Sequence, residues 1–212
     1  QTCALPIWFD APCSKSDAPR LQTLTDYWDE IKTLKAVPTV KVDGTSTTLS
    51  MDERGQVHVY SRNWELDSMS SNMQLAKRFQ LDKMLWPGMA VQFELCGPGI
   101  QSNRLKLPAQ RPFVFAVWKD HHKIDRDQWP TGMPNLAVPE LDENEWALTG
   151  SVDDMIAKVD GLRGNVTKDR LDEGIVWHLH EDQQLSEGLA DELGANRCFK
   201  IINNKYLTKN GL

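Results

Sequence analysis

The first hydrophobic pattern in the chain has the spacing of an amphipathic helix. Large apolar side chains recur every three or four residues at Leu21, Leu24, Trp28, Ile31 and Leu34. This spacing places them on one face, so we predict a helix that Pro38 ends. The apolar run at residues 39–42 follows and is predicted to be a strand.

The middle of the chain carries the patterns of several strands. Residues 47–51 and 56–61 flank a polar turn that ends in Gly55, which predicts a β-hairpin. Residues 89–95 and 112–118 are short apolar runs bounded by proline and glycine, as buried strands are. Between the hairpin and these runs, helical spacing over residues 73–85 predicts a second helix.

The second half is less regular. Residues 119–150 are polar and contain several prolines, so we predict a long loop or insertion. Ser151 and Asp154 have the spacing of a capping box, and Gly161 is a typical helix stop. The remaining elements are predicted as strands at residues 175–179 and 198–202 and a helix around residues 185–193. Strands and helices do not alternate regularly, so we predict an α+β fold dominated by antiparallel strands.

Composition narrows the class of protein. The chain has 40% hydrophobic and 25% charged residues, which is ordinary for a globular domain, and a formal net charge of -6. This acidity argues against broad binding to nucleic acid but leaves room for a local basic groove. No apolar run is long enough for a membrane helix. The 4 cysteines lack CxxC spacing, which favours a reduced compartment over a zinc site. We expect a cytoplasmic monomer.

The first residues are treated separately. Residues 1–7 have the appearance of a translated adaptor and do not start with methionine, so we exclude them from fold reasoning. We expect residues 8–212 to form a single domain.

Short motifs with reactive side chains occur at the ends of, or within, the predicted strands. They are Lys41-Val42-Asp43-Gly44, Ser61-Arg62-Asn63, Phe93-Glu94-Leu95-Cys96-Gly97, Phe113-Val114-Phe115, Asp172-Glu173-Gly174-Ile175-Val176 and Phe199-Lys200-Ile201. Lys41 lies between a strand and a tight turn, a position that can present its amine as a nucleophile. Glu94 lies between two apolar residues, where a carboxylate without a partner is costly to bury. Taken singly, Lys41 and Arg62 could each be solvated surface residues, and Phe115 could be a core side chain.

The series of motifs resembles the lysine-adenylating nucleotidyltransferases, which comprise DNA ligases, RNA ligases and mRNA-capping enzymes. The resemblance extends over residues 39–206, and the run Gly97-Pro98-Gly99-Ile100-Gln101 with Asn103 resembles the RNA ligase 2 branch. It implies a nucleotidyltransferase (ligase adenylation) domain with antiparallel sheets flanked by helices. It also implies an ATP-dependent RNA ligase that joins 5′-phosphate and 3′-hydroxyl ends through a lysyl-AMP intermediate and an adenylated 5′ end.

The resemblance implies the catalytic roles as well. Lys41 would attack the α-phosphate of ATP, Lys200 would contact the same phosphate, and Glu173 would help to hold Mg²⁺. Asp43 would orient the lysine or water on a metal, although its place before glycine is also explained by turn formation alone.

Three further residues are implied to bind the nucleotide. Arg62 would contact the ribose and later the strand end, Glu94 would accept hydrogen bonds from the ribose hydroxyls, and Phe115 would stack on adenine. Asn103, Arg104 and Lys106 could contact phosphates.

The sequence departs from the family pattern in its last motif. Most relatives have a second lysine where this chain has Ile202, so either Lys205 substitutes for it or one step is slower. The implied partner is nicked or single-stranded RNA ends, and the resemblance is compatible with a phage or microbial origin. Relatives usually carry a further C-terminal domain that we expect this chain to lack.

Two alternatives stay open at the level of sequence. One is a DNA ligase or a capping-type nucleotidyltransferase. The other is a degenerate module that binds a nucleotide or a strand end without catalysis, motivated by Ile202.

Overall fold

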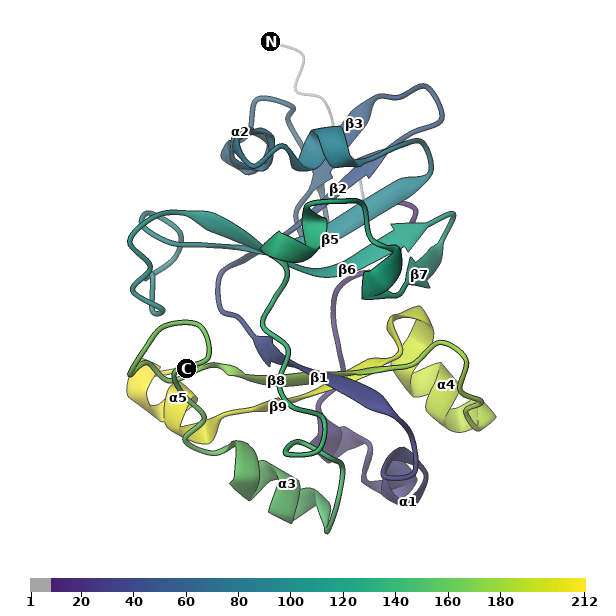
Figure 1. Ribbon diagram of the computed structural model, residues 1–212, viewed down its shortest axis with the longest axis vertical. Helices are drawn as coiled ribbons and strands as arrows, with labels where there is room; N and C mark the ends of the chain where they lie inside the picture. The colour runs from purple at the N-terminus through teal and green to yellow at the C-terminus, as the bar shows by residue number, and fades with distance from the viewer. Residues whose placement is uncertain (1–8) are drawn as a thin grey trace. The chain divides into compact units, whose positions relative to one another are not determined.

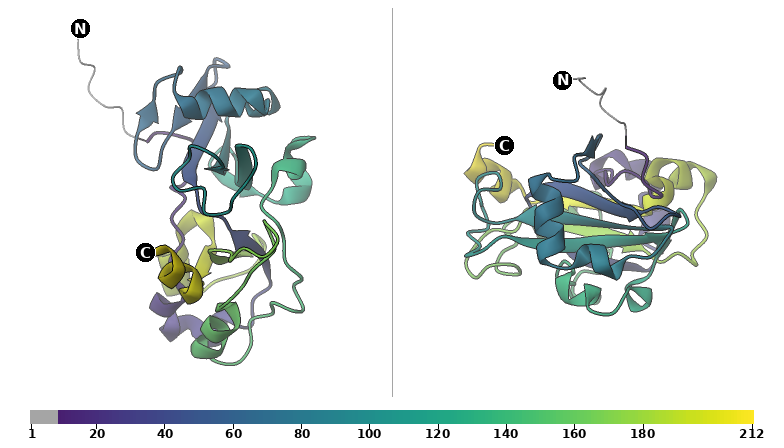
Figure 2. Two further views of the ribbon diagram at one scale, coloured as in Figure 1. Left: turned by 90° about the vertical axis from the view of Figure 1, so that its left-hand side faces the viewer. Right: turned by 90° about the horizontal axis from the view of Figure 1, so that it is seen from above.

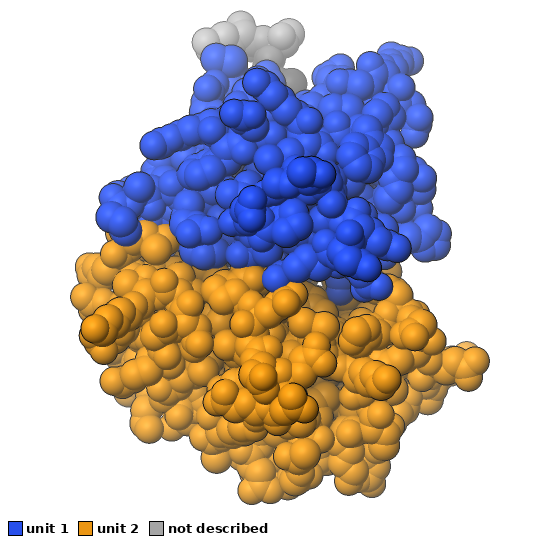
Figure 3. Space-filling view, in the orientation of Figure 1, with its two compact units in different colours: residues 1–16, 44–102, 108–137 blue, residues 17–43, 103–107, 138–212 orange. Residues whose placement is uncertain are grey.

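The structure, a computed structural model, describes residues 9–212, so the residues interpreted as adaptor-derived lie outside the described part. The chain forms two compact units (Figure 3). Of the described residues, unit 1 comprises 9–16, 44–102 and 108–137, and unit 2 comprises 17–43, 103–107 and 138–212. Within residues 9–212, no helix has both the length and the hydrophobicity needed to cross a membrane.

Unit 1 is built on a six-stranded antiparallel sheet with the strand order β4-β3-β2-β5-β6-β7 (Figure 1). The strands are β2 (Thr45–Met51), β3 (Val57–Tyr60), β4 (Glu65–Leu66), β5 (Met89–Cys96), β6 (Arg111–Lys119) and β7 (His122–Ile124). The predicted hairpin and the two predicted buried strands are therefore confirmed. The predicted long loop at residues 119–150 is mostly irregular but begins with β7 and contains the 3₁₀ turns η4 (Arg126–Gln128) and η5 (Met133–Leu136).

One face of this sheet carries the hydrophobic core of unit 1. Leu49, Val91 and Phe93 are fully buried there and pack with residues of α2 (Ser71–Arg78), which lies across the sheet in Figure 2. The helix predicted over residues 73–85 is interrupted, because Gln80 adopts a left-handed conformation with φ 58°. The chain continues as the 3₁₀ turn η3 (Leu81–Met84), which keeps its apolar residues in the same core.

The opposite face of the same sheet is polar. Alternation along the strands places Ser46, Thr48, Gln92 and Glu94 on it, since Ser46 pairs with Glu94 and Thr48 with Gln92. The Gln92 side chain accepts a hydrogen bond from the Trp118 indole at 2.9 Å and donates one to a backbone carbonyl of the segment 9–16. That segment therefore lies along the polar face and satisfies part of its hydrogen bonding.

Unit 2 is built on a three-stranded antiparallel sheet with the order β1-β8-β9. Its strands are β1 (Ala36–Lys41), β8 (Gly174–Leu179) and β9 (Cys198–Ile202), and its α-helices are α1 (Trp28–Ile31), α3 (Val152–Val159), α4 (Glu187–Leu193) and α5 (Asn204–Asn210). One sheet face packs on these elements through Ile175, Trp177, Phe199 and Ile201. The last two predicted strands are confirmed, and α5 is an element that the sequence patterns did not indicate.

The predicted N-terminal helix is only partly correct. The segment consists of two 3₁₀ turns, η1 (Leu21–Thr23) and η2 (Thr25–Tyr27), followed by the single-turn α1. The apolar positions are nevertheless buried in the core of unit 2, so the spacing identified the buried face and not the type of helix.

Pro38 does not precede the first strand, as predicted, but lies within it. Among the strands, β1 pairs only with β8, and residues 138–141 run along its other side, where the Val40 amide donates to the Pro139 carbonyl and the Leu141 amide donates to the Pro38 carbonyl. The Pro38 nitrogen faces the same outer side, so the missing amide costs no ladder hydrogen bond with β8. By contrast, the predicted capping box is confirmed: Ser151 and Asp154 exchange hydrogen bonds at the start of α3, and Gly161 follows its end with φ 89°.

Candidate active site

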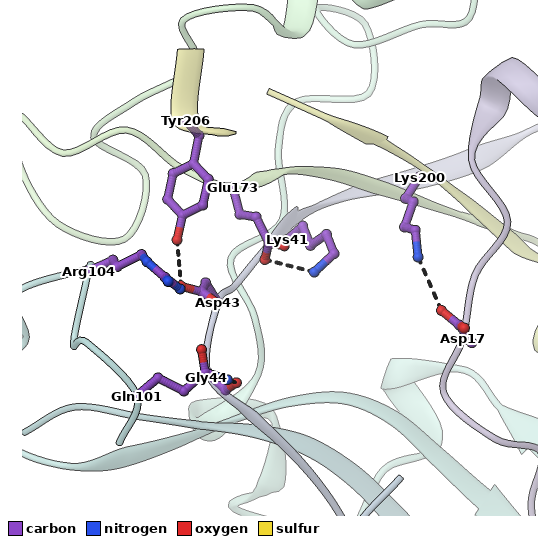
Figure 4. Close-up of polar contacts among 9 residues, drawn as sticks. All are labelled: Asp17, Lys41, Asp43, Gly44, Gln101, Arg104, Glu173, Lys200 and Tyr206. Atoms are coloured by element: carbon purple, nitrogen blue, oxygen red, sulfur yellow. Dashed lines mark hydrogen bonds and ion pairs between the residues drawn. The ribbon is translucent and has the colours of Figure 1, made fainter. Parts of the chain in front are cut away.

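Lys41 and Glu173 form the central contact of the candidate site (Figure 4). Lys41 is the last residue of β1, and Glu173 directly precedes β8, the strand with which β1 pairs. Lys41 Nζ lies 2.7 Å from Glu173 Oε2. The side chains are 26% and 15% exposed, respectively, so the ion pair is shielded but reachable from solvent. Because this amine is accessible and its carboxylate partner is adjacent, Lys41 has the surroundings expected of a nucleophile.

Gly174 makes the close approach of the strands possible. A Cβ atom at this position would overlap the carbonyl oxygen of Ile201 on β9. Gly174 is also the residue with which Lys41 pairs in the sheet. The carboxylate of Glu173, one residue earlier, therefore lies next to Lys41.

Lys200 lies on the same sheet face as Lys41. In the pairing register Thr39, Val176 and Lys200 form one row across the sheet, and Lys41, Gly174 and Ile202 form the next. Lys200 Nζ contacts Asp17 Oδ1 at 3.2 Å. The apolar Ile202 thus occupies the position of the second lysine of the family pattern on this face. Lys205, the alternative source of this charge, has its amine 3.5 Å from Asp160 Oδ2.

Asp43 is held by two donors. Its Oδ2 atom accepts a hydrogen bond from Arg104 Nη1 at 2.7 Å and another from the Tyr206 hydroxyl at 2.6 Å (Figure 4). Burial, and then the contact with Asp43, raise the pKa of Tyr206 well above its usual range, so the hydroxyl remains a donor. Arg104, which the sequence suggested could contact phosphates, has its guanidinium on this carboxylate.

The fully buried Asn203 joins the segments around the site. Its side chain accepts hydrogen bonds from the amides of Gly161 and Tyr206 and donates to the carbonyls of Leu162 and Asp172. Asn203 thus begins α5 and at the same time fixes the backbone immediately before Glu173.

The implied nucleotide-contact residues belong to unit 1. Glu94 lies half-buried on the polar sheet face, in register with Ser46 on β2 and Phe113 on β6. Phe115 lies in a β-bulge between β5 and β6. Gln92 pairs with residue 116 and Phe93 pairs with residue 114, so Phe115 has no partner on β5. Bulges redirect side chains, and Phe115 is only partly buried. Phe115 therefore lies at the margin of a small buried cluster with Ala90, Ala116 and Trp118, with part of its side chain exposed.

Two more sequence features of unit 1 have clear positions. Arg62 is exposed in the turn between β3 and β4. Gly44 lies against the backbone of Leu95, where a Cβ atom would overlap the carbonyl oxygen, and the Gln101 side chain donates a hydrogen bond to the Gly44 carbonyl. The glycine of the KVDG motif and the glutamine of the GPGIQ motif are thus in contact within this unit.

The structure brings together Lys41 and Glu173, places Lys200 on their sheet face, and adds a residue that motif reasoning missed. Tyr206 belongs to no motif, and only Asn203, a typical N-cap residue after a strand, hints at the helix that carries it. The position of Tyr206 depends on tertiary folding.

The residues present are compatible with a divalent cation. Glu173 offers hard carboxylate oxygens, which Mg²⁺ and Mn²⁺ prefer. Within residues 9–212 no group of three His, Cys, Asp or Glu side chains is arranged to bind a metal. A single carboxylate suffices where the phosphates of a nucleotide supply further ligands, as Mg²⁺ commonly requires.

The sequence pattern of the RNA ligase family matches residues 35–202, which is most of the chain. The chain therefore belongs to the RNA ligase family, and the resemblance seen in the motifs is confirmed. No curated protein gives a significant match to the sequence.

Solved structures of Naegleria gruberi RNA ligase share the fold. The structure with pyrophosphate has a TM-score of 0.77 and 25% identity, covering 96% of this chain and 60% of that one. A variant with ATP and Mn has a TM-score of 0.75 and 25% identity, covering 96% and 59%. A variant with AMP and Mn has a TM-score of 0.71 and 26% identity, covering 95% and 59%. The present chain thus spans about three fifths of their length, and the predicted α+β nucleotidyltransferase fold is confirmed.

Proposed function

We propose that this chain is the adenylating part of an ATP-dependent RNA ligase and that Lys41 is the residue that becomes adenylated. The observation that carries the proposal is the contact of Lys41 Nζ with Glu173 Oε2 at 2.7 Å, at the two motif positions to which the resemblance assigns the nucleophile and the metal-holding carboxylate. The Naegleria gruberi structures with ATP and Mn and with AMP and Mn support the choice of nucleotide.

In the first step, the Lys41 amine would attack the α-phosphorus of ATP. A nitrogen–phosphorus bond forms, the bond from that phosphorus to the pyrophosphate oxygen breaks, and pyrophosphate leaves. An amine in an ion pair is protonated and has no lone pair for attack, so the Nζ proton must first be lost. Water can take the proton, because the Lys41 side chain is 26% exposed, and the hydrogen bond to Glu173 Oε2 holds the amine in position.

Charge neutralisation is the second requirement of this chemistry. Lys200, on the sheet face that bears Lys41, would interact with the negative charge of the α-phosphate and favour departure of pyrophosphate. A divalent cation, when bound, would neutralise further phosphate charge, and Glu173 is the residue that would hold it. With Ile202 in place of a second lysine, a larger share of the positive charge must come from Lys200 and the cation.

Unit 1 would contribute recognition of the nucleoside. Phe115, turned out of the ladder by the bulge, would stack on the adenine, and Glu94 would accept hydrogen bonds from the ribose hydroxyls. Arg62 would contact the ribose and later the strand end. These roles follow the family pattern, and the partial exposure of all three side chains is compatible with them.

The later steps would transfer AMP from Lys41 to a 5′-phosphate of RNA and then join that end to a 3′-hydroxyl with release of AMP. Nicked or single-stranded RNA ends are the proposed substrates. A monomer in the cytoplasm is part of the same proposal.

The test is covalent labelling. The protein is incubated with ATP labelled at the α-phosphate and Mg²⁺, and the labelled adduct is located by mass spectrometry. We expect an AMP adduct on Lys41 that Lys41→Ala abolishes, whereas Lys32→Ala, which removes an exposed lysine of the same unit, leaves labelling unchanged. A wild-type protein that stays unlabelled at saturating ATP rules the proposal out.

The presence of Ile202 favours one second candidate, a module that binds a nucleotide or strand end without catalysis. Binding of ATP without adduct formation would support it. The same assay with GTP in place of ATP, followed by comparison of nicked RNA with nicked DNA, separates an RNA ligase from a capping enzyme or a DNA ligase.

A further inference from the structure

We propose that Tyr206 and Arg104 are positioning residues for the adenylation of Lys41: they hold Asp43 as a clamp and thereby fix the end of the strand that presents the nucleophile. This inference rests on the proposed function. It assigns a role to Asp43, which the motif left open between catalysis and simple turn formation, and to a tyrosine outside every motif.

The clamp is compact and directed at one atom. Arg104 Nη1 and the Tyr206 hydroxyl both donate to Asp43 Oδ2, at 2.7 Å and 2.6 Å. Charged acceptors with two donors form stronger hydrogen bonds than neutral pairs do. The Asp43 side chain is 14% exposed and Tyr206 is 1% exposed, so water competes poorly for these contacts.

The Tyr206 arm connects the two strands that carry the catalytic lysines. Helix α5 begins directly after β9, the strand of Lys200, and its N-cap Asn203 fixes the first turn by accepting from the Tyr206 amide at 3.3 Å. On the other side, only the buried Val42 separates Asp43 from Lys41. A hydrogen bond from Tyr206 to Asp43 therefore joins the end of β1 to the end of β9.

The Arg104 arm comes from a rigid turn. The Asn103 side chain accepts from the Leu107 amide at 3.0 Å and donates to the Leu107 carbonyl at 3.1 Å. Leu105, between them, is 2% exposed. The guanidinium is thus presented by a closed turn and not by a free loop.

The electrostatic consequence concerns Lys41. Two carboxylates lie near this lysine: Asp43 is two residues away in the sequence, and Glu173 is in direct contact with its amine. Either carboxylate could attract the ammonium group. Arg104 gives Asp43 a cation of its own, and Tyr206 occupies the same oxygen. Lys41 is left to pair with Glu173, the geometry that the proposed chemistry needs. The role assigned to the clamp is therefore to direct the amine, without contact between Tyr206 and the substrate.

The test is a double-mutant cycle. Adenylation is measured in single turnover for the wild type, Tyr206→Phe, Asp43→Asn and the double variant. We expect Tyr206→Phe to slow adenylation about tenfold, the effect of a lost hydrogen bond to a charged group, with the KM for ATP changed less than about twofold. In the Asp43→Asn background the same substitution should have little further effect, because the clamp is already broken.

The controls separate positioning from general stability. Tyr27→Phe removes a hydroxyl elsewhere in unit 2 and should leave the rate unchanged. Arg104→Lys should retain more activity than Arg104→Ala, since it keeps a cation. Hydrogen exchange of the peptide covering residues 40–44 should increase in Tyr206→Phe, while the melting temperature stays close to that of the wild type.

The outcomes distinguish the clamp from the proposed function. An unlabelled wild type refutes the function, and the exchange measurement still decides whether Tyr206 orders the strand end. Equal rates for wild type and Tyr206→Phe, losses that multiply independently of Asp43, or unchanged exchange at residues 40–44 each overturn the clamp.

Discussion

The two units carry functional side chains on sheet faces of opposite character. In unit 2 the charged groups are paired, with Lys41 bound to Glu173, Lys200 to Asp17, and Arg104 to Asp43. In unit 1 the face around Glu94 carries mainly hydroxyl and amide side chains together with the apolar cluster of Ala90, Ala116 and Trp118, and its charged pair, His58 with Glu65, lies on the outer strands β3 and β4.

The difference matches two different chemical demands. Transfer of a phosphoryl-linked group requires charges that are fixed near the developing negative charge. Recognition of a base and a sugar requires neutral hydrogen-bonding groups and an aromatic surface. We therefore expect substitutions at the Lys41–Glu173 pair of unit 2 to act mainly on kcat for adenylation, and substitutions at the nucleoside-contact residues of unit 1 to act mainly on the KM for ATP.

The largest effect is expected at Glu173. Glu173→Gln keeps the shape of the side chain but removes the charge that pairs with Lys41 and that would hold the cation. Loss of one preorganised electrostatic group in an active site costs about 10²–10³-fold in rate, so we expect kcat for adenylation to fall at least about a hundredfold. The measurement is single-turnover labelling with α-labelled ATP over a series of Mg²⁺ concentrations.

Glu187→Gln is the matched control, because Glu187 is an exposed carboxylate in the first turn of α4 in the same unit. A Glu173→Gln variant that labels at the wild-type rate would remove the basis for assigning chemistry to unit 2.

A smaller effect, on the KM for ATP and not on kcat, is expected at Phe115 in unit 1. Stacking of a base on an aromatic side chain contributes about 1–3 kcal/mol, so Phe115→Ala should raise the KM for ATP about tenfold. Once ATP saturates the protein, the adenylation rate should be close to that of the wild type. Phe115→Trp retains an aromatic face and should restore most of the affinity.

Melting curves of both Phe115 variants are needed, since the ring also packs against the residues around Trp118. If the rate at saturating ATP falls while the KM is unchanged, the division of roles between the units is wrong.

Local patterns in the sequence predicted much of the fold and of the site. The hairpin, the buried strands and the capping box at Ser151 depend on neighbouring residues, and all were confirmed. The motif lysine and glutamate were proposed in advance from the resemblance to the nucleotidyltransferases, and the structure places their side chains 2.7 Å apart. The left-handed Gln80 was not predicted, since nothing in the helical spacing marks a break there.

Contacts between distant segments could not be predicted. The hydrogen bond between Tyr206 and Asp43 joins residues 163 positions apart, and it exists only because α5 follows β9 within the folded sheet of unit 2. The division of the chain into two units could not be predicted from the sequence either, because each unit is assembled from separate stretches of the chain. Pro38 was misjudged because the rule that proline interrupts structure does not apply to an edge strand.

The smallest effect, and the only expected gain, concerns the ion pair between Lys200 and Asp17. A phosphate that binds Lys200 has to compete with this carboxylate, which lies 3.2 Å from the amine and is 65% exposed. Exposed ion pairs contribute about 0–1 kcal/mol, so Asp17→Asn should lower the KM for ATP by at most about fivefold, with kcat little changed. The measurement is the ATP dependence of the labelling rate. Asp29→Asn, which breaks the exposed pair with Lys32, is the control and should change neither parameter. A higher KM in Asp17→Asn would mean that the carboxylate orients Lys200 for phosphate instead of competing with it, and the paired charges of unit 2 would then be part of the binding geometry.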